Sequence, residues 1–174
     1  MLEAFQITQK GLMVSTFLGI GIALISIYLG DKTVIRGKDK SLRGLLYLWK
    51  KSPLLTVLLT ILIGPFFEEV VFRLIGINLL NILFPTIISV IITSIAFGLA
   101  HNQFPLNVIS GLMGVVLAII YLNYGVIASF ITHGVQNGLV LLNLYHIVLE
   151  KTGMNIAKAL DMYDIDELVS LLDS

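Results

Sequence analysis

The stretch Gly64-Pro65-Phe66-Phe67-Glu68-Glu69-Val70-Val71-Phe72-Arg73 places two adjacent carboxylates and a guanidinium inside an apolar segment. That segment runs from Ser52 to Leu83 and carries no other charge. An ionised carboxylate in hydrocarbon costs at least ~2.5 kcal/mol, so acids in a membrane need partners, water or a changed protonation state. Because such groups usually mark functional sites, we interpret Glu68, Glu69 and Arg73 as part of one.

The helical spacing predicts that the two acids point in different directions. If the segment is helical, Glu69 and Arg73 lie four residues apart with the acid on the N-terminal side, which favours an ion pair. Glu68 is turned about 100° away from its neighbour around the same helix. One acid can therefore be neutralised while the other faces elsewhere. The alternative, an ion pair that only joins two helices, leaves Glu68 unexplained.

The composition indicates an integral membrane protein. Of the 174 residues, 57% are hydrophobic and 13% are charged, and the mean hydropathy is +0.96. This leaves too little polar material to cover a soluble globule. The formal charge is zero, so nothing suggests a nucleic-acid partner. The absence of cysteine excludes disulfides, thiolate metal sites and a cysteine nucleophile.

The apolar segments predict an all-α transmembrane bundle of about five spans with amphipathic interfacial helices. A span needs ~20 residues, and the first candidate has eighteen uncharged ones. No basic region precedes it, so we expect it to be retained rather than cleaved as a signal. Asn123-Tyr124-Gly125 is a turn signal between the last two spans. The expected spans are residues 12–29, 53–83, 86–100, 106–122 and 126–148.

The charged residues lie mainly at the ends of the apolar region. Residues 31–51 hold seven of the eleven basic residues, and Trp49 belongs to an amphipathic helix that we expect at the lipid surface. The positive-inside rule makes this loop cytoplasmic. Five acids lie in the last fourteen residues. We therefore expect one transmembrane domain, residues 1–150, followed by an acidic amphipathic cytoplasmic tail, residues 151–174.

Polar groups on three spans are expected to meet. If the second and third spans are antiparallel about Pro85, Glu68 and His101 lie at equal depth and within plausible contact. His133 and Asn137 share one face of the fifth span at i and i+4. On straight helices His133 is misplaced in depth by roughly a dozen Å, which tilt must absorb. A lone buried histidine is often only bonded to a carbonyl, but ionisable groups that gather in a membrane indicate a site.

Three motifs resemble the signatures of a known family. Glu68-Glu69 with Arg73, Phe97 with His101, and His133 with Asn137 resemble the EExxxR, FxxxH and HxxxN signatures of the CAAX-processing and bacteriocin-processing intramembrane proteases. The eukaryotic representative of that family is the type II CAAX prenyl endopeptidase. The resemblance covers about residues 53–146. Leu74 departs from it, since the family often has glycine directly after the arginine.

The resemblance implies hydrolysis of a peptide bond in a membrane-associated peptide or protein, in the bilayer of a prokaryotic plasma membrane. Glu68 is then the general base that activates water, assisted by His101. His133 and Asn137 hold the developing oxyanion, and Glu69, Arg73 and Phe97 support the site. The chemistry agrees, because amide hydrolysis needs a base and also needs donors for the tetrahedral oxygen.

Three alternatives stay open. Glu68, His101 and His133 form a His2Glu set of the kind that catalytic Zn2+ uses, although the family's glutamic mechanism needs no ion. The same groups can shape a binding surface in a non-catalytic membrane adaptor or bacteriocin self-immunity protein. A proton-coupled transporter is the third alternative, but it predicts paired half-chains with broken helices, and the sequence shows no such symmetry.

Overall fold

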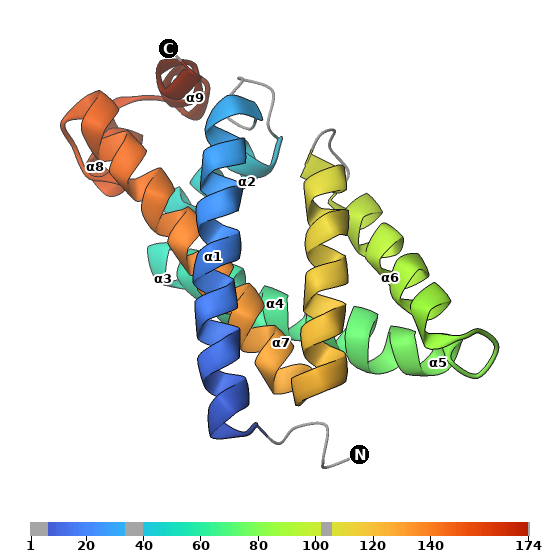
Figure 1. Cartoon of the computed structure of the whole chain (residues 1–174). Coiled ribbons are helices and arrows are strands. Elements are labelled where there is room, and N and C mark those ends of the chain that lie inside the picture. Colours follow the sequence, from blue (N-terminus) through green and yellow to red (C-terminus); the bar gives the residue numbers. More distant parts are fainter. Residues whose placement is uncertain (1–6, 34–39, 102–105, 174) are drawn as a thin grey trace.

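The computed structural model describes residues 7–33, 40–101 and 106–173, which form helices and connecting turns without any strand (Figure 1). The predicted all-α class is confirmed. The chain runs through α1 (Gln9–Thr33), α2 (Lys40–Lys51), α3 (Pro53–Leu58), η2 (Leu59–Ile63), α4 (Gly64–Glu69), η3 (Val70–Ile77), α5 (Asn78–Leu80), α6 (Thr86–Ala100), α7 (Leu106–Thr152), α8 (Ile156–Met162) and α9 (Ile165–Asp173).

Three helical stretches in the described part of the chain are long and apolar enough to cross a membrane: Gln9–Tyr28, Pro53–Leu80 and Asn107–Thr152. The last of them turns at Gly125, whose φ of 85° and ψ of 174° are not helical. Glycine adopts a positive φ without steric cost, so the turn falls where the sequence predicts it. It separates the expected fourth and fifth spans. α6, the expected third span, has only 15 residues.

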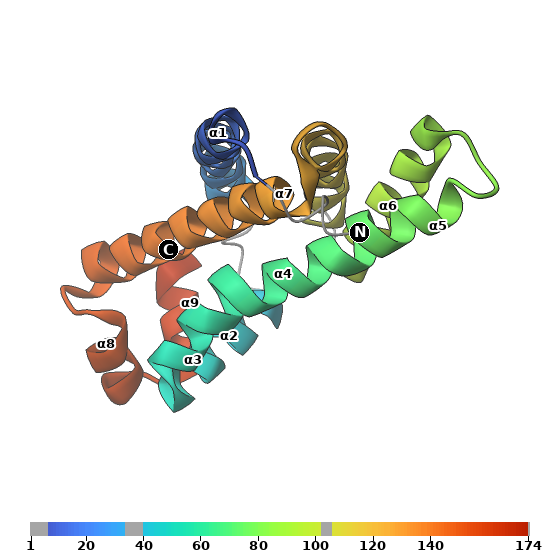
Figure 2. The ribbon, with the colours of Figure 1, turned by 90° about the horizontal axis from the view of Figure 1, so that it is seen from below.

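The turn at Gly125 decides where His133 lies. The second part of α7, residues 126–152, crosses α1 and runs alongside the long helix built from α3, α4 and α5 (Figures 1 and 2). The first part of α7, residues 106–124, packs against α6 and also contacts the long helix, where Arg73 donates to the Gly114 carbonyl. The depth mismatch calculated for His133 assumed straight antiparallel helices. It disappears because the chain turns across the molecule before it reaches this residue.

The helix from Pro53 to Leu80 is continuous and carries two π-helical stretches. It begins at Pro53, and the Ser52 hydroxyl accepts a hydrogen bond from the Leu55 N–H at 3.3 Å. In a π-helix each N–H bonds to the carbonyl five residues back, as the Gly64 N–H does with Leu59. Such stretches are frequent at functional sites. Here η2 and η3 flank α4, which ends with the two glutamates.

An apolar core lies at one end of the molecule, where α2, α8 and α9 pack on the last turns of α7; we call this assembly the cap. Apolar side chains from all four helices pack together there. The buried core residues are Leu46, Val148, Ile156, Ala159, Leu160, Leu168, Val169 and Leu172.

The cap also contains the basic amphipathic helix that we expect at the lipid surface, and that placement stays a prediction. Trp49 is half-buried against the cap core, where α8 and α9 pack on α2. The basic segment and the acidic tail also meet directly through an ion pair between Arg43 and Asp166. Residues 34–39 of the expected loop, and the turn at 102–105, lie outside the described residues.

Candidate functional site

Glu69 is the centre of a buried polar network that joins two helices. Its side chain is 0% exposed. Oε1 accepts a hydrogen bond from His133 Nδ1 at 3.0 Å, and Oε2 accepts one from the Ser129 hydroxyl. Oε2 also lies 3.3 Å from Arg73 Nε. Two hydrogen-bond donors from α7 and the positive charge of Arg73 on its own helix thus compensate the burial of this carboxylate, as a buried charge requires.

The ion pair expected from the i, i+4 spacing of Glu69 and Arg73 is present. The guanidinium is almost fully buried, so it needs more than one partner. Arg73 Nη2 donates to the Gly114 carbonyl at 3.3 Å, and the guanidinium carbon lies 4.3 Å from the centre of the Phe97 ring. A cation over an aromatic face is stabilised by the ring's electron density. Arg73 therefore connects α6 and the first part of α7 to the glutamate helix.

Glu68 differs from its neighbour in exposure and in partners. Its side chain is 39% exposed, and its Oε2 lies 3.7 Å from His133 Nε2. That separation is too long for a direct hydrogen bond. The carboxylate therefore stays accessible to a water molecule while it faces the histidine that Glu69 holds from the other side. The two adjacent acids are divided as their helical spacing predicts, with one neutralised and the other facing elsewhere.

The two histidines present defined nitrogen atoms to the site. Carboxylate and carbonyl oxygens only accept, so the Nδ1–H of His133 donates to Glu69 and the Nδ1–H of His101 donates to the Phe97 carbonyl at 2.9 Å. The Nε2 atom of each ring takes no part in these bonds. For His133, Nε2 is the atom that faces Glu68.

The direct contact expected between Glu68 and His101 does not form: among the described residues no ion pair within 4.0 Å joins them. The reason is local. His101 is the C-cap residue of α6, and its ring turns back along its own helix to the Phe97 carbonyl. Phe97 instead supplies the connection, because its buried ring lies 4.8 Å from the ring of His101 and 5.7 Å from that of His133. This gives the predicted supporting residue a position between both histidines and Arg73.

Asn137 lies one helical turn beyond His133 on the same face of α7. Its Nδ2 donates a hydrogen bond to the Thr60 carbonyl in η2 at 3.0 Å. A carboxamide nitrogen has two hydrogens, so this bond leaves the second N–H unused. The bond fixes the carboxamide against the long helix.

Ser129 is a site residue that the sequence prediction missed. Its buried hydroxyl can donate to Glu69 Oε2 or to the Leu117 carbonyl, 3.1 Å away, and the charged acceptor makes the stronger bond. The signal was in the sequence, because Ser129, His133 and Asn137 recur at intervals of four and so share one face of the helix. Serine is common in transmembrane helices, however, and this one stands out only when its partner is known.

The structure does not group the three residues of the alternative zinc set, Glu68, His101 and His133. Across residues 7–33, 40–101 and 106–173, no three histidine, cysteine or acidic side chains are grouped so that they could hold a metal ion. Glu68 and His133 face each other, but His101 is turned to Phe97. The donors that a His2Glu site needs do not converge here.

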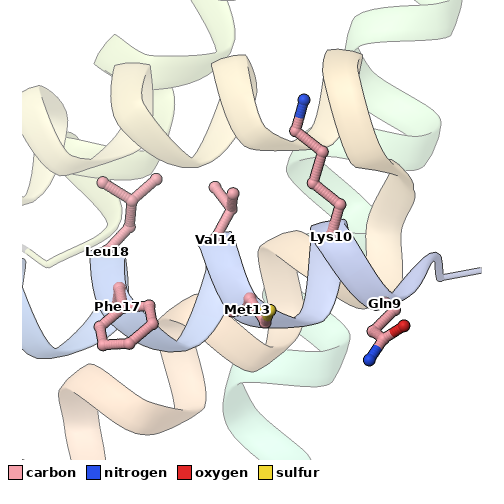
Figure 3. Close-up of a pocket in the computed structure, with 6 residues that line it drawn as sticks. All are labelled: Gln9, Lys10, Met13, Val14, Phe17 and Leu18. Atoms are coloured by element: carbon pink, nitrogen blue, oxygen red, sulfur yellow. The ribbon is translucent and has the colours of Figure 1, made fainter.

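The structure also has a shallow hollow of about 740 Å³ on α1, away from these residues (Figure 3). Its lining is mostly apolar, and Met13 and Phe17 in it are more than half exposed. None of the site residues contributes to it. We therefore treat it as part of the apolar outer surface of α1. The lining residues are Gln9, Lys10, Met13, Val14, Phe17 and Leu18.

Comparison with known proteins gives one match. A family model described as "Type II CAAX prenyl endopeptidase Rce1-like" matches residues 50–139, just over half of the chain. The matched region contains both glutamates, the arginine, both histidines and the asparagine described above. Neither the curated proteins nor the solved structures searched contain a match to this chain. α1, α8 and α9 lie outside the matched region.

Proposed function

This chain belongs to the Rce1-like family of type II CAAX prenyl endopeptidases, and from that membership we propose that it hydrolyses a peptide bond of a membrane-associated peptide or protein by the glutamic mechanism. The family, together with the three long apolar helices among the described residues, makes it a membrane protein. The family gives it the general function of an intramembrane protease. The observation that carries our proposal is that the two glutamates differ in exposure and in partners. Glu69 is buried and hydrogen-bonded, whereas Glu68 is partly exposed.

Glu68 is the proposed general base. It is the more exposed acid, and neither Arg73 nor Ser129 neutralises it. A base must reach the proton that it removes, so accessibility to water is the first requirement. Glu69 cannot take this role, because it is fully buried, its two oxygens already accept hydrogen bonds from Ser129 and His133, and Arg73 pairs with its charge. Its proposed task is to accept the Nδ1–H of His133 and so to hold the ring in one orientation.

His133 and Asn137 are the proposed donors to the oxyanion. Asn137 has an unused N–H beside its bond to Thr60. Donation from His133 Nε2 requires a proton on that nitrogen as well, since Nδ1 already donates to Glu69. This role therefore belongs to the doubly protonated ring. Fixed donors directed at a developing negative charge are often the largest contribution to catalysis.

The proposed reaction has two steps. In the first, Glu68 takes a proton from water as the water oxygen bonds to the substrate carbonyl carbon, and the carbonyl electron pair moves to the oxygen. In the second, that pair returns, the C–N bond breaks, and the proton on Glu68 passes to the leaving nitrogen. His101, whose Nε2 is not bound to Phe97, is the proposed assistant to proton transfer.

The experiment is a comparison of peptide termini in membrane fractions. Cells that lack the protein are complemented with the wild type, with Glu68→Gln or with the matched control Glu150→Gln, which alters an exposed glutamate on α7. We expect new termini with the wild type and the control and none with Glu68→Gln. Termini that persist with Glu68→Gln would refute Glu68 as the base. A cellular phenotype that survives without any cleavage would identify an adaptor instead.

The proposal also covers the membrane orientation, the substrate and the cofactor. The basic α2 and the acidic tail lie together in the cap, which we propose faces the cytoplasm of a prokaryotic cell. The substrate is one that the bilayer presents to the helices around Glu68. We propose no cofactor, because the donors of the conditional metal set do not converge.

A further inference from the structure

The Thr60 carbonyl that holds Asn137 lies in an unusual position in its helix. It belongs to η2, where each carbonyl accepts a hydrogen bond from the N–H five residues later. The expected donor to the Thr60 carbonyl is therefore the backbone N–H of residue 65. Residue 65 is proline, which has no N–H. The preceding N–H, that of Gly64, bonds to Leu59. The Thr60 carbonyl therefore has no backbone donor from these two residues, and it accepts its hydrogen bond from the Asn137 side chain of another helix.

A second contact shows how closely α7 approaches this part of the helix. A Cβ on Gly134 would lie 2.8 Å from the carbonyl oxygen of Ile61, a distance that real Cβ atoms do not reach. Gly134 is one turn before Gly138 and three residues before Asn137, so the same face of α7 rests on consecutive carbonyls of η2. The carboxamide of Asn137 can reach Thr60 because no side chain at 134 separates the helices.

From these contacts we infer that Pro65 is a positioning residue for Asn137: by lacking an N–H, it keeps the Thr60 carbonyl available to bind the Asn137 carboxamide. With any other residue at 65, a backbone N–H would compete for that carbonyl from within the helix. The displaced carboxamide would lose its fixed orientation. This inference extends the proposed function, because the oriented group is a proposed oxyanion donor.

The first test measures stability and does not depend on catalysis. Asn137→Ala is made in the wild type and in Pro65→Ala, and thermal unfolding of the four purified proteins is followed in detergent. In the wild type, loss of the carboxamide leaves the Thr60 carbonyl without a donor and lowers the unfolding midpoint by about 2–4 °C. In Pro65→Ala the new backbone N–H replaces it, so the drop is less than half as large. Equal drops in both backgrounds would overturn the inference.

The second test measures catalysis on a substrate found by the terminus comparison. Pro65→Ala is expected to lower kcat at least tenfold with little change in KM, because the misplaced donor acts in the transition state. Replacing Pro65 by lactic acid, which has an ester oxygen in place of the N–H, is expected to restore kcat. If the lactic acid variant is as slow as Pro65→Ala, the proline ring and not the missing N–H is what matters, and the inference is wrong.

Pro53→Ala is the matched control for both tests. It makes the same change in the same helix, but at the first turn, where an added N–H displaces no side chain. It is expected to leave kcat and the effect of Asn137→Ala unchanged. The two tests also separate this inference from the proposed function, because the stability result stands even if no substrate is cleaved.

Discussion

Changing Glu69 to glutamine should test whether the buried network depends on charge. The substitution keeps the size of the side chain and one acceptor oxygen, but it removes the negative charge beside Arg73, 3.3 Å away. Glu69 is 0% and Arg73 1% exposed, so the guanidinium would remain in an apolar interior without its counter-charge. Breaking a buried pair from one side costs about 3–5 kcal/mol.

We expect the lower end of that range, about 3 kcal/mol, because the amide oxygen still accepts a hydrogen bond and Phe97 still contacts the guanidinium. For a chain of this length that corresponds to a fall of roughly 6–12 °C in the unfolding midpoint. The assay is thermal unfolding of purified protein in a fixed detergent. Glu150→Gln, at an exposed position, should change stability by no more than about 0.5 kcal/mol.

A double variant completes the test. Removing both charges with Glu69→Gln and Arg73→Met should recover most of the lost stability, since apolar replacement of a buried pair is often neutral. It should not recover cleavage, because His133 still lacks its carboxylate partner. A single Glu69→Gln variant as stable as the control would refute the reasoning, and so would a double variant no more stable than the single one.

Three further outcomes are expected. Ser129→Ala should lower stability by about 1–3 kcal/mol and slow cleavage, because the buried Glu69 loses a hydrogen-bond donor. Thr132→Val changes another buried hydroxyl on the same helix and should not slow cleavage. Gly134→Ala should lower the unfolding midpoint by several degrees, because its Cβ meets a backbone carbonyl at 2.8 Å, whereas Gly138→Ala makes only an ordinary contact at 3.5 Å with a side chain. Leu168→Ala should cost about 2–5 kcal/mol by opening a cavity in the cap, as thermal unfolding would show.

Local spacing predicted those parts of the site that lie on one helix. The pairing of Glu69 with Arg73 and the shared face of His133 and Asn137 follow from 3.6 residues per turn. The turn at Gly125 follows from its sequence signal, but the direction in which the chain leaves it does not. That direction depends on the backbone angles of the glycine and on the helices packed around it, and it places His133 beside both glutamates.

The sequence did not predict partners that come from other helices. His101 could donate either to the Glu68 carboxylate or to the Phe97 carbonyl of its own helix. In the structure it donates to the Phe97 carbonyl. The apolar face of α2 could be read from the sequence, but not whether lipid or protein covers it. The acidic tail covers it in the structure, where Arg43 and Asp166 also pair. Amphipathicity shows that a face is buried and does not identify what buries it.

The sequence also did not predict the π-helical stretches η2 and η3. Proline inside a helix commonly bends it, yet the long helix continues through Pro65. In η2, just before Pro65, each hydrogen bond spans one residue more than in an α-helix. Which carbonyl is left over depends on the register of those stretches, and only the structure shows that Asn137 binds it.

The most direct test of the central claim is to follow solvent oxygen into the product. Purified wild-type protein is incubated with a cleaved peptide in water enriched in oxygen-18, and the released fragments are weighed by mass spectrometry. A Glu68-activated water predicts one heavy oxygen in each new carboxyl group with the wild type and no product with Glu68→Gln. A Glu68→Gln protein that cleaves at the wild-type rate, or a new carboxyl group without solvent oxygen, would contradict the account.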